Sequence, residues 1–297
     1  PVAPGAALPW QRPRRRMLSA VCRPCKPCRG AAPGKDFEEV QGVVVMAREP
    51  REEQTLENGA KYTGQWMGGL PDGDGMQTWP DGSKYMGEFR AGKAEGRGTF
   101  EYPNGDVYVG PWVDDHAEGE GTCVHQNGSV YKGEWVRGRE HGQGTVSFPD
   151  GTKFAGQYKG GVKHGFGTFY FAGKSDCFYE GEFREDDFSG KGVYVWEDGR
   201  RYEGQWRDSR MDGHGVLLFH DGRSYEGQHV EDRREGTGVF VWPDGRRYKG
   251  QFRNNKEHGQ GAFRAANGKL VLGEWRDGKL AKKSSKAATD SHDDEVD

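Results

Sequence analysis

Three cysteines near the start of the chain have a spacing that could support metal or thiol chemistry. Cys22, Cys25 and Cys28 form Cys-x-x-Cys-x-x-Cys in a segment rich in proline and arginine. A structural zinc site needs a fourth ligand and a small fold around it, and no further Cys or His lies nearby in sequence. If translation begins at Met17, the cysteines lie close to an N-terminus and beside basic residues, where S-acylation plus a polybasic patch anchors a protein to a membrane. The alternatives are S-acylation, which we favour as the functional one, a zinc site, or incidental cysteines in a disordered leader.

Histidines and glycines also recur, and neither set has the spacing of a catalytic centre. His141, His164 and His258 occupy equivalent positions of a repeat, so neighbouring equivalents would lie about 10 Å apart, too far to share a metal ion within one chain. We interpret them as polar loop residues, with a metal that bridges two molecules as the alternative. No glycine-rich segment has the Gly-x-x-x-x-Gly-Lys-Ser/Thr form of a phosphate loop. We expect no catalytic residue, no cofactor and no resident metal, and therefore no enzyme.

Composition and charge narrow the class of protein. The net charge is −3, which gives no large field to steer nucleic acid, and 33% of the residues are hydrophobic while 49 are glycine. Residues 1–35 carry basic side chains and no acid, whereas the end of the chain is acidic. No apolar stretch reaches the roughly 18 residues of a membrane-spanning helix, and no secretory signal is evident. Because five cysteines fit a reduced compartment, we expect a cytoplasmic location, at the inner face of a membrane if the leader is acylated.

The elements that must position any site are repeats. The pattern Tyr-x-Gly-x-aromatic returns every 23 residues, with one step of 25 residues between Phe154 and Tyr179. Each copy also has a Gly-x-Gly, such as Gly96 and Gly98, and ends with Asp-Gly or Asn-Gly, such as Asp81-Gly82. The aromatic residues of the pattern are Tyr62, Trp66, Tyr85, Phe89, Tyr108, Trp112, Tyr131, Trp135, Phe154, Tyr158, Tyr179, Phe183, Tyr202, Trp206, Tyr225, Tyr248, Phe252 and Trp275.

Each part of the pattern has a structural interpretation. Asp-Gly and Asn-Gly favour two-residue hairpin turns, in which both central residues need a positive φ, and longer glycine-rich loops would then join the strands at the other edge. Side chains alternate along a strand, so Tyr85, Gly87 and Phe89 share one face, and the glycine leaves a gap that neighbouring rings can fill. The sequence predicts an all-β fold: an extended, twisted, solenoid-like single antiparallel sheet of tandem hairpins, nine full and one partial, held by aromatic rings across strands.

The composite pattern resembles the membrane occupation and recognition nexus (MORN) repeat. The resemblance covers about residues 57–280, with 1–56 expected as a disordered, basic, cysteine-containing leader and 281–297 as a disordered charged tail. It implies a shallow aromatic groove on members that serve as scaffolds, membrane tethers or targeting arrays beside a catalytic domain. About 56 and 17 flanking residues are too few for such a domain. Three residues depart from the pattern: Pro111, which predicts a bulge or a local edge, His229 in place of an aromatic ring, and Val271 in place of Tyr.

These features predict a non-catalytic scaffold or adaptor that binds protein partners at the cytoplasmic face of a membrane or at a cytoskeletal structure. The ligand would be an extended peptide or a helix in the groove formed by the aromatic residues named above, although self-packing within a thin sheet is the alternative role of those rings. An anionic membrane surface and a homodimer are the other partners that the sequence allows, and nucleic acid is not expected. The alternative functions are a peripheral protein that binds anionic phospholipid and a regulatory relative of a phosphoinositide kinase.

Overall fold

The computed structural model describes residues 38–40, 43–45, 47–173 and 176–284. They divide into two compact units, a first unit ending at Gly165 and a second unit beginning at Phe166, so the division falls within β14. The strands up to this point are β1 (Glu38–Val40), β2 (Val43–Val45), β3 (Glu49–Thr55), β4 (Lys61–Met67), β5 (Leu70–Thr78), β6 (Lys84–Arg90), β7 (Lys93–Glu101), β8 (Val107–Val113), β9 (His116–Ala117), β10 (Gly119–Val124), β11 (Val130–Val136), β12 (Arg139–Ser147), β13 (Lys153–Lys159) and β14 (Val162–Tyr170). The second unit continues with β15 (Phe178–Arg184), β16 (Asp187–Val195), β17 (Arg201–Arg207), β18 (Arg210–Leu218), β19 (Ser224–Val230), β20 (Arg233–Val241), β21 (Arg247–Arg253), β22 (Lys256–Arg264), β23 (Leu270–Arg276) and β24 (Lys279–Lys283).

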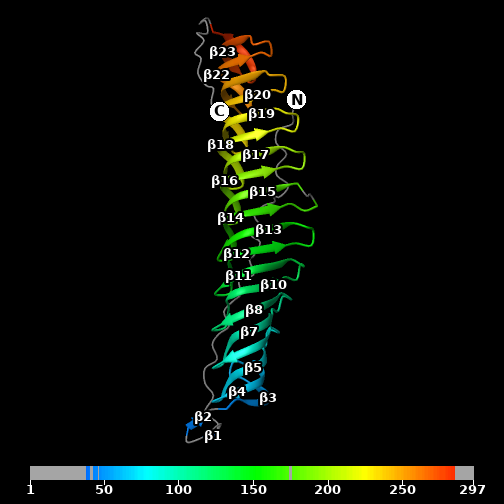
Figure 1. The fold of residues 1–297 in the computed structure, drawn as a ribbon, viewed down its shortest axis with the longest axis vertical. Coiled ribbons are helices and arrows are strands. Elements are labelled where there is room, and N and C mark those ends of the chain that lie inside the picture. Colours follow the sequence, from blue (N-terminus) through cyan, green and yellow to red (C-terminus); the bar gives the residue numbers. More distant parts are fainter. Residues whose placement is uncertain (1–37, 41–42, 46, 174–175, 285–297) are drawn as a thin grey trace. The chain divides into compact units, whose positions relative to one another are not determined.

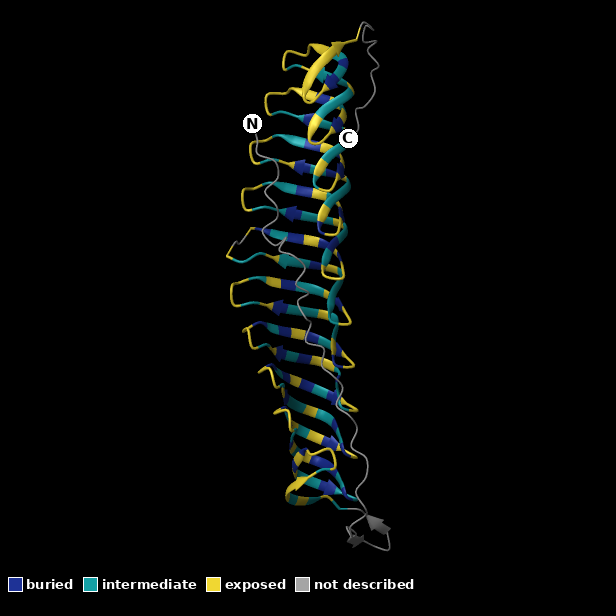
Figure 2. Cartoon of the chain, turned by 180° about the vertical axis from the view of Figure 1, so that it is seen from behind, coloured by how far each residue is buried: buried dark blue, intermediate teal, exposed yellow. Residues whose placement is uncertain are grey.

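The strands pair in chain order. From β3 onward they form one open antiparallel sheet of hairpins, and Figure 1 shows the strands of each unit side by side in that order. Strands β1 and β2 pair only with each other. Buried and exposed residues alternate along the strands, as Figure 2 shows, because successive side chains point to opposite faces. The all-β fold of tandem hairpins is confirmed.

A tyrosine packed against two glycines forms the centre of nearly every repeat. Gly87 and Gly98 face each other across β6 and β7, and the Tyr85 ring lies over both. A Cβ at Gly98 would come within 2.4 Å of the Tyr85 ring, so no larger residue fits there without a shift. The predicted gap beside glycine therefore exists, and the tyrosine of the same repeat fills it.

The rings continue from repeat to repeat within each unit. Tyr85 contacts Phe89 and Trp112 edge-to-face, with ring centres 5.0 and 5.2 Å apart. Its hydroxyl donates to the Glu88 carbonyl at 3.0 Å. Burial raises the pKa of these tyrosines, that of Tyr225 to about 12, so each hydroxyl stays a proton donor. Edge-to-face aromatic pairs supply both burial and geometry, and they form the core of a sheet that has few aliphatic residues.

The Gly-x-Gly pair combines a bulge with this packing. The ladder between β6 and β7 shifts register after Gly87, and Gly96 opposite has a φ of 64°. The Glu88 carboxylate accepts the backbone N–H of Arg97 at 2.9 Å and so closes the bulge. A Gln or Glu at the same place makes this contact in other repeats, as Gln205 does with His214 at 2.7 Å. The recurrent glycines thus have structural roles.

The two kinds of turn are the reverse of the prediction. Tight two-residue turns, here called short turns, lie at the edge where longer loops were expected. Both central residues of a short turn have positive φ; in one of these turns they are Asp114 (47°) and Asp115 (65°). At the Asp-Gly and Asn-Gly pairs, here called Gly turns, only the glycine has positive φ, 88° at Gly82. The Gly82 N–H bonds to the Trp79 carbonyl at 3.0 Å, which gives a type I turn followed by a glycine bulge.

The prediction failed because Asp-Gly suits both turn types, each of which places glycine in the left-handed region. The register of the flanking strands decides between them. The short turns tolerate non-glycine residues because neighbouring repeats hold them. Asp232, for example, accepts the Met211 N–H at 2.9 Å through its carboxylate and donates its own N–H to the Met211 carbonyl at 3.0 Å.

Pro111 interrupts the sheet as predicted. Other repeats have one nine-residue strand at this point, such as β7, whereas here the chain divides into β9 and β10. Proline has no N–H for the ladder and no side-chain acceptor of the kind that Glu88 provides. The carbonyl of Pro111 still accepts the Glu118 N–H at 3.0 Å, so the interruption is local.

The sheet extends beyond the predicted array of 57–280. β3 pairs with β4, and β24 pairs with β23, so residues 49–55 and 281–283 are strand rather than leader or tail. Neither segment carries the aromatic pattern. Each pairs with the outer strand of a hairpin and forms no aromatic core of its own. Arg51 of β3 lies 5.2 Å from the ring centre of Trp66 and covers that ring. Residues 38–40 and 43–45, also predicted as disordered leader, form β1 and β2. The predictions for residues 1–37 and 285–297 lie outside the described residues.

Candidate interaction surfaces

The aromatic residues proposed for a groove are all buried. Tyr62, Tyr85 and Tyr202 have no exposed surface, and Tyr158 and Trp275, among the most accessible of the set, are each 6% exposed. Phe154, in place of Tyr, is also fully buried. These rings contact one another within each unit, which is the self-packing alternative. A partner would have to contact other side chains unless the rings rearranged.

The polar residues considered for chemistry do not assemble into a centre. Cys22, Cys25 and Cys28 lie outside the described residues, so S-acylation stays a prediction. Within residues 47–173 and 176–284, no three His, Cys, Asp or Glu side chains converge as a metal site. The same residues contain no helix long and apolar enough to cross a membrane.

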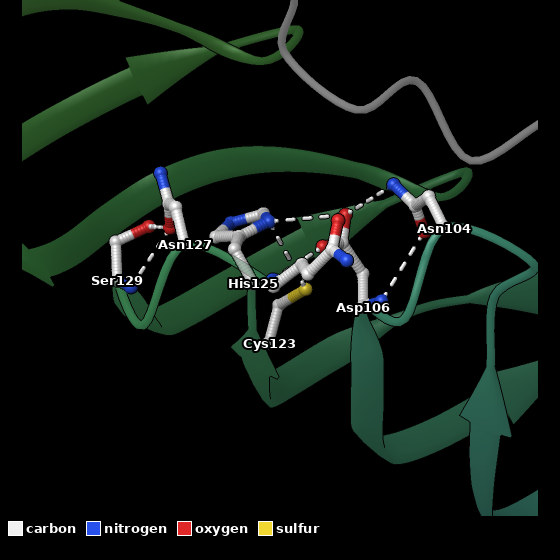
Figure 3. Close-up of polar contacts among 7 residues, drawn as sticks. Asn104, Asp106, Cys123, His125, Asn127 and Ser129 are labelled. Atoms are coloured by element: carbon white, nitrogen blue, oxygen red, sulfur yellow. Dashed lines mark hydrogen bonds and ion pairs between the residues drawn. The ribbon is translucent and has the colours of Figure 1, made fainter.

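A cysteine, a histidine and an aspartate do meet at the Gly turns around β8 and β10. Figure 3 shows the His125 ring in contact with both Asp106 and Cys123. The His125 Nδ1 lies 3.3 Å from an Asp106 carboxylate oxygen and 3.9 Å from the Cys123 sulfur. Both contacts use the same ring nitrogen, whereas in a Cys-His-Asp triad the thiol and the carboxylate contact different nitrogens of the imidazole. This cluster therefore lacks the arrangement of a nucleophilic site.

Asp106 has instead a structural role that links two repeats. Its carboxylate accepts the Gln126 N–H at 2.8 Å and the Asn104 side-chain amide at 3.0 Å (Figure 3). Burial alone would raise the pKa of Asp106, but the bonds from Gln126, Asn104 and His125 outweigh it and hold the pKa below its ordinary value. The carboxylate stays ionised and joins successive Gly turns.

His229 replaces a core ring and is the most unusual polar residue in the interior. It is 1% exposed, lies edge-to-face between Tyr202 and Tyr225 at 5.1 Å from each ring centre, and neither ring nitrogen makes a hydrogen bond of good geometry within the described residues. Burial and then the nearby Arg234 lower its pKa to about 4. The neutral imidazole thus packs as an aromatic ring. The departure from the repeat pattern at His229 therefore does not interrupt the packing of the rings.

The solvent face of the first unit exposes aliphatic side chains that sequence reasoning missed. Val109 and Val113 of β8 are 51% and 48% exposed. Met86, Val124 and Val136 on neighbouring strands are also exposed, and we call these five residues the valine face. The signal was present in Val107-Tyr-Val-Gly-Pro-Trp-Val113, where apolar residues occupy both faces of one strand. Contiguous exposed apolar surface of this kind is typical of interaction sites.

The solvent face of β17 in the second unit is charged at the positions equivalent to Val109 and Val113, although Leu218 and Val230 on neighbouring strands are exposed too. Glu203 and Arg207 stand on β17 where β8 has Val109 and Val113. Arg207 pairs with Asp212 at 2.9 Å. The repeat backbone therefore accepts either character at this face, and the aliphatic character of the first unit is not needed for folding.

The Gly-turn edge of the second unit carries arginines on aromatic rings. Arg200, Arg223 and Arg246 lie 5.0, 4.9 and 5.3 Å from the ring centres of Trp196, Phe219 and Trp242. The sequence signal is an aromatic residue four places before arginine with Asp-Gly between, which occurs three times in succession.

Comparison with known proteins gives fold-level likeness to solved structures and no match among curated proteins. The TCP domain of SAS-4 (dCPAP) from Drosophila melanogaster, solved with a proline-rich motif of Ana2, is 11% identical over 61% of this chain and 85% of that one, with a TM-score of 0.26. A mutant TCP10 domain of Danio rerio CPAP is 13% identical over 80% of this chain and 100% of that one, with a TM-score of 0.31. At scores this low the likeness does not imply a shared function.

The family comparison is specific. The MORN repeat matches nine times, at residues 62–84, 85–107, 108–130, 131–153, 154–175, 179–200, 202–222, 225–246 and 248–269. The copies follow the hairpins described above, each beginning at the core tyrosine or at Phe154 and running to the turn or loop before the next copy. The chain belongs to the MORN repeat family.

Proposed function

We propose that this protein is a non-catalytic scaffold that binds a protein partner through the valine face of its first unit. The observation that carries the proposal is the exposure of aliphatic side chains on β8, with Val109 51% exposed. Transfer of such side chains from water to an interface contributes roughly 25 cal/mol per Å² of apolar surface. Since the aromatic residues of the repeat pattern are buried, a partner has to use exposed side chains such as these.

The test converts the valine face into the equivalent face of the second unit. Val109→Glu with Val113→Arg places at β8 the residues that β17 already carries as Glu203 and Arg207, so the hairpin should fold. Proximity labelling and cross-linking in cells would compare this double variant with wild type. The matched control is Glu203→Gln with Arg207→Gln. We expect partners cross-linked at β8 to be lost in the double variant and kept in the control. A partner set equal in all three proteins would contradict the proposal.

A cytoplasmic location, at the inner face of a membrane, is part of the same proposal. It is supported by the basic leader with Cys22, Cys25 and Cys28 rather than by the repeats. Replacement of all three cysteines by serine should abolish hydroxylamine-sensitive acylation and release the full chain from membrane pellets. Unchanged pelleting would refute anchoring by these cysteines and favour direct binding of anionic lipid.

A further inference from the structure

Three Gly turns of the second unit present the same pair of side chains. In each turn the aromatic residue donates its N–H to the carbonyl of the arginine four places later, as Trp196 does to Arg200 at 2.9 Å. This bond closes the base of the turn and sets the two side chains next to each other. The guanidinium then stacks on the ring, a contact that is favourable through cation–π attraction.

A second contact fixes the direction of each guanidinium. The Nε–H groups of Arg200, Arg223 and Arg246 bond to the turn aspartates Asp198, Asp221 and Asp244 at 2.8, 2.7 and 2.7 Å. Within the part of the chain that the structure describes, the Nη atoms of these arginines have no hydrogen-bond partner. The arginine side chains are 36%, 28% and 44% exposed. Each pair of Nη donors is therefore oriented, accessible and free for a planar anion, for which the guanidinium geometry suits bidentate binding.

The spacing of the three arginines points to a polymer as the ligand. Successive arginines are one repeat apart, which is two strand spacings or about 10 Å. Three residues of an extended peptide span about 10 Å as well. We propose that the arginine ladder formed by Arg200, Arg223 and Arg246 binds an extended acidic segment of a partner protein in which carboxylates recur at every third residue.

A peptide fits this edge better than a flat anionic surface does. Asp198, Asp221 and Asp244 lie beside the arginines, and Glu203 lies beside Arg201, with which it pairs at 2.6 Å. A membrane plane would approach these acidic groups together with the arginines and lose much of the attraction. A single peptide chain can follow the line of the Nη donors. Its intervening side chains would contact Trp196, Phe219 and Trp242, which are half-buried.

The proposal deepens the protein-binding function but uses a different unit and a different surface from the valine face. It therefore fails or succeeds separately. The Val109→Glu, Val113→Arg double variant should bind the acidic peptide as wild type does, whatever the cell experiment shows.

The test measures fluorescence anisotropy of a labelled peptide with glutamate at every third position, added to the full chain. A second peptide has the same composition, but its glutamates are gathered in one half of the peptide, at every second position. It tests whether the spacing of the carboxylates matters. The variant Arg200→Gln, Arg223→Gln, Arg246→Gln removes the ladder. The matched control Arg184→Gln, Arg253→Gln, Arg276→Gln removes the same charge from exposed arginines at the ends of other strands in the same unit. Both sets are surface changes, and circular dichroism checks that both proteins fold.

We expect the triple ladder variant to bind the regularly spaced peptide at least tenfold more weakly, and the control to bind as wild type. The rearranged peptide should bind several-fold more weakly to wild type. A ladder variant with lysine at all three positions should recover only part of the binding, because lysine keeps the charge but lacks the fork. Equal affinity for both peptides, or no loss in the ladder variant, would overturn the proposal. The proposal would also be overturned if the full chain bound phosphatidylserine vesicles but not the peptide, and if the ladder variant lost that vesicle binding.

Discussion

The Gly-turn edges of the two units have the same backbone and differ in the side chain at the end of each turn. In the first unit Ser83, Asp106 and Ser129 occupy that place and are 5%, 4% and 3% exposed. In the second unit Arg200 and Arg223 occupy it, and their side chains are 36% and 28% exposed. The turn hydrogen bonds are equivalent, 2.9 Å from Trp79 to Ser83 and 2.9 Å from Trp196 to Arg200.

This difference shows how a repeat array can separate folding from recognition. A short polar side chain bonds back to the turn or, as Asp106 does, to the next repeat, and it leaves no donor for a ligand. Arginine is too long for that role and stacks on the ring with its outer donors free. The same fold can therefore have a closed edge in one unit and a binding edge in the other.

The largest expected effect tests what the units have in common. Gly98→Val in the first unit and Gly215→Val in the second place a side chain where the tyrosine ring lies, since even a Cβ would come within 2.4 Å of Tyr85 or Tyr202. We expect each to lower the free energy of unfolding by about 4 kcal/mol, above the usual cost of overpacking because the ring has no space to move. Urea denaturation followed by tryptophan fluorescence measures this. If only one variant were destabilised, the two cores would not be equivalent.

The next effect concerns His229, where the core of the second unit departs from that of the first. Its folded-state pKa of about 4 lies below the ordinary value of 6.5, so the unfolded chain takes up a proton first as the pH falls. Stability should be unaffected above pH 7 and decrease from about pH 6.5 toward pH 4, by about 2 kcal/mol at pH 5. His229→Phe, with the ring found at the equivalent Phe252, should remove this dependence. Urea midpoints from pH 8 to pH 5 measure it, and identical pH profiles would disprove the assignment to His229.

A smaller effect compares one turn aspartate from each edge, Asp106 at the last position of its turn and Asp221 two residues before the last position of its turn. Asp106→Ala removes a buried carboxylate that accepts the Gln126 N–H, and we expect a loss of about 1–2 kcal/mol in the free energy of unfolding. Because the pKa of Asp106 is lowered, its contribution is present above the ordinary carboxyl pKa and is lost as the pH falls through the folded-state value. Asp221→Ala, at an exposed turn, should be nearly neutral. Hydrogen exchange at the backbone N–H groups of Gln126 and Arg223 measures the effect at each edge. Equal losses of protection in the two variants would mean that the edges do not differ.

The smallest effect separates binding from stability at the arginine ladder. Removal of one cation–π contact by Arg223→Gln should cost about 0.5 kcal/mol, since the side chain is partly exposed. Thermal melts would detect a shift of a degree or two at most. A large loss of stability would show that Arg223 is a folding residue and would remove the contrast with Ser83 and Ser129.

The sequence alone determined the hairpin repeat, because the pattern of Tyr, Gly and aromatic residues is local and recurs every 23 residues. It also predicted the break at Pro111, because proline lacks the backbone N–H of the ladder at any position in a sheet. Only the tertiary structure decided the turn types, since Asp-Gly is compatible with two turns and the strand register selects one.

Tertiary structure also decided which residues remain for partners. Alternation places Tyr85 and Met86 on opposite faces, but the pattern does not say which face is covered. The glycine pair lets the Tyr85 ring lie flat against the strands and buries it completely. The aromatic residues that the sequence offered as a groove thus became the core, and the candidate surfaces moved to Val109 and to Arg223, whose exposure depends on the packing of the neighbouring repeats.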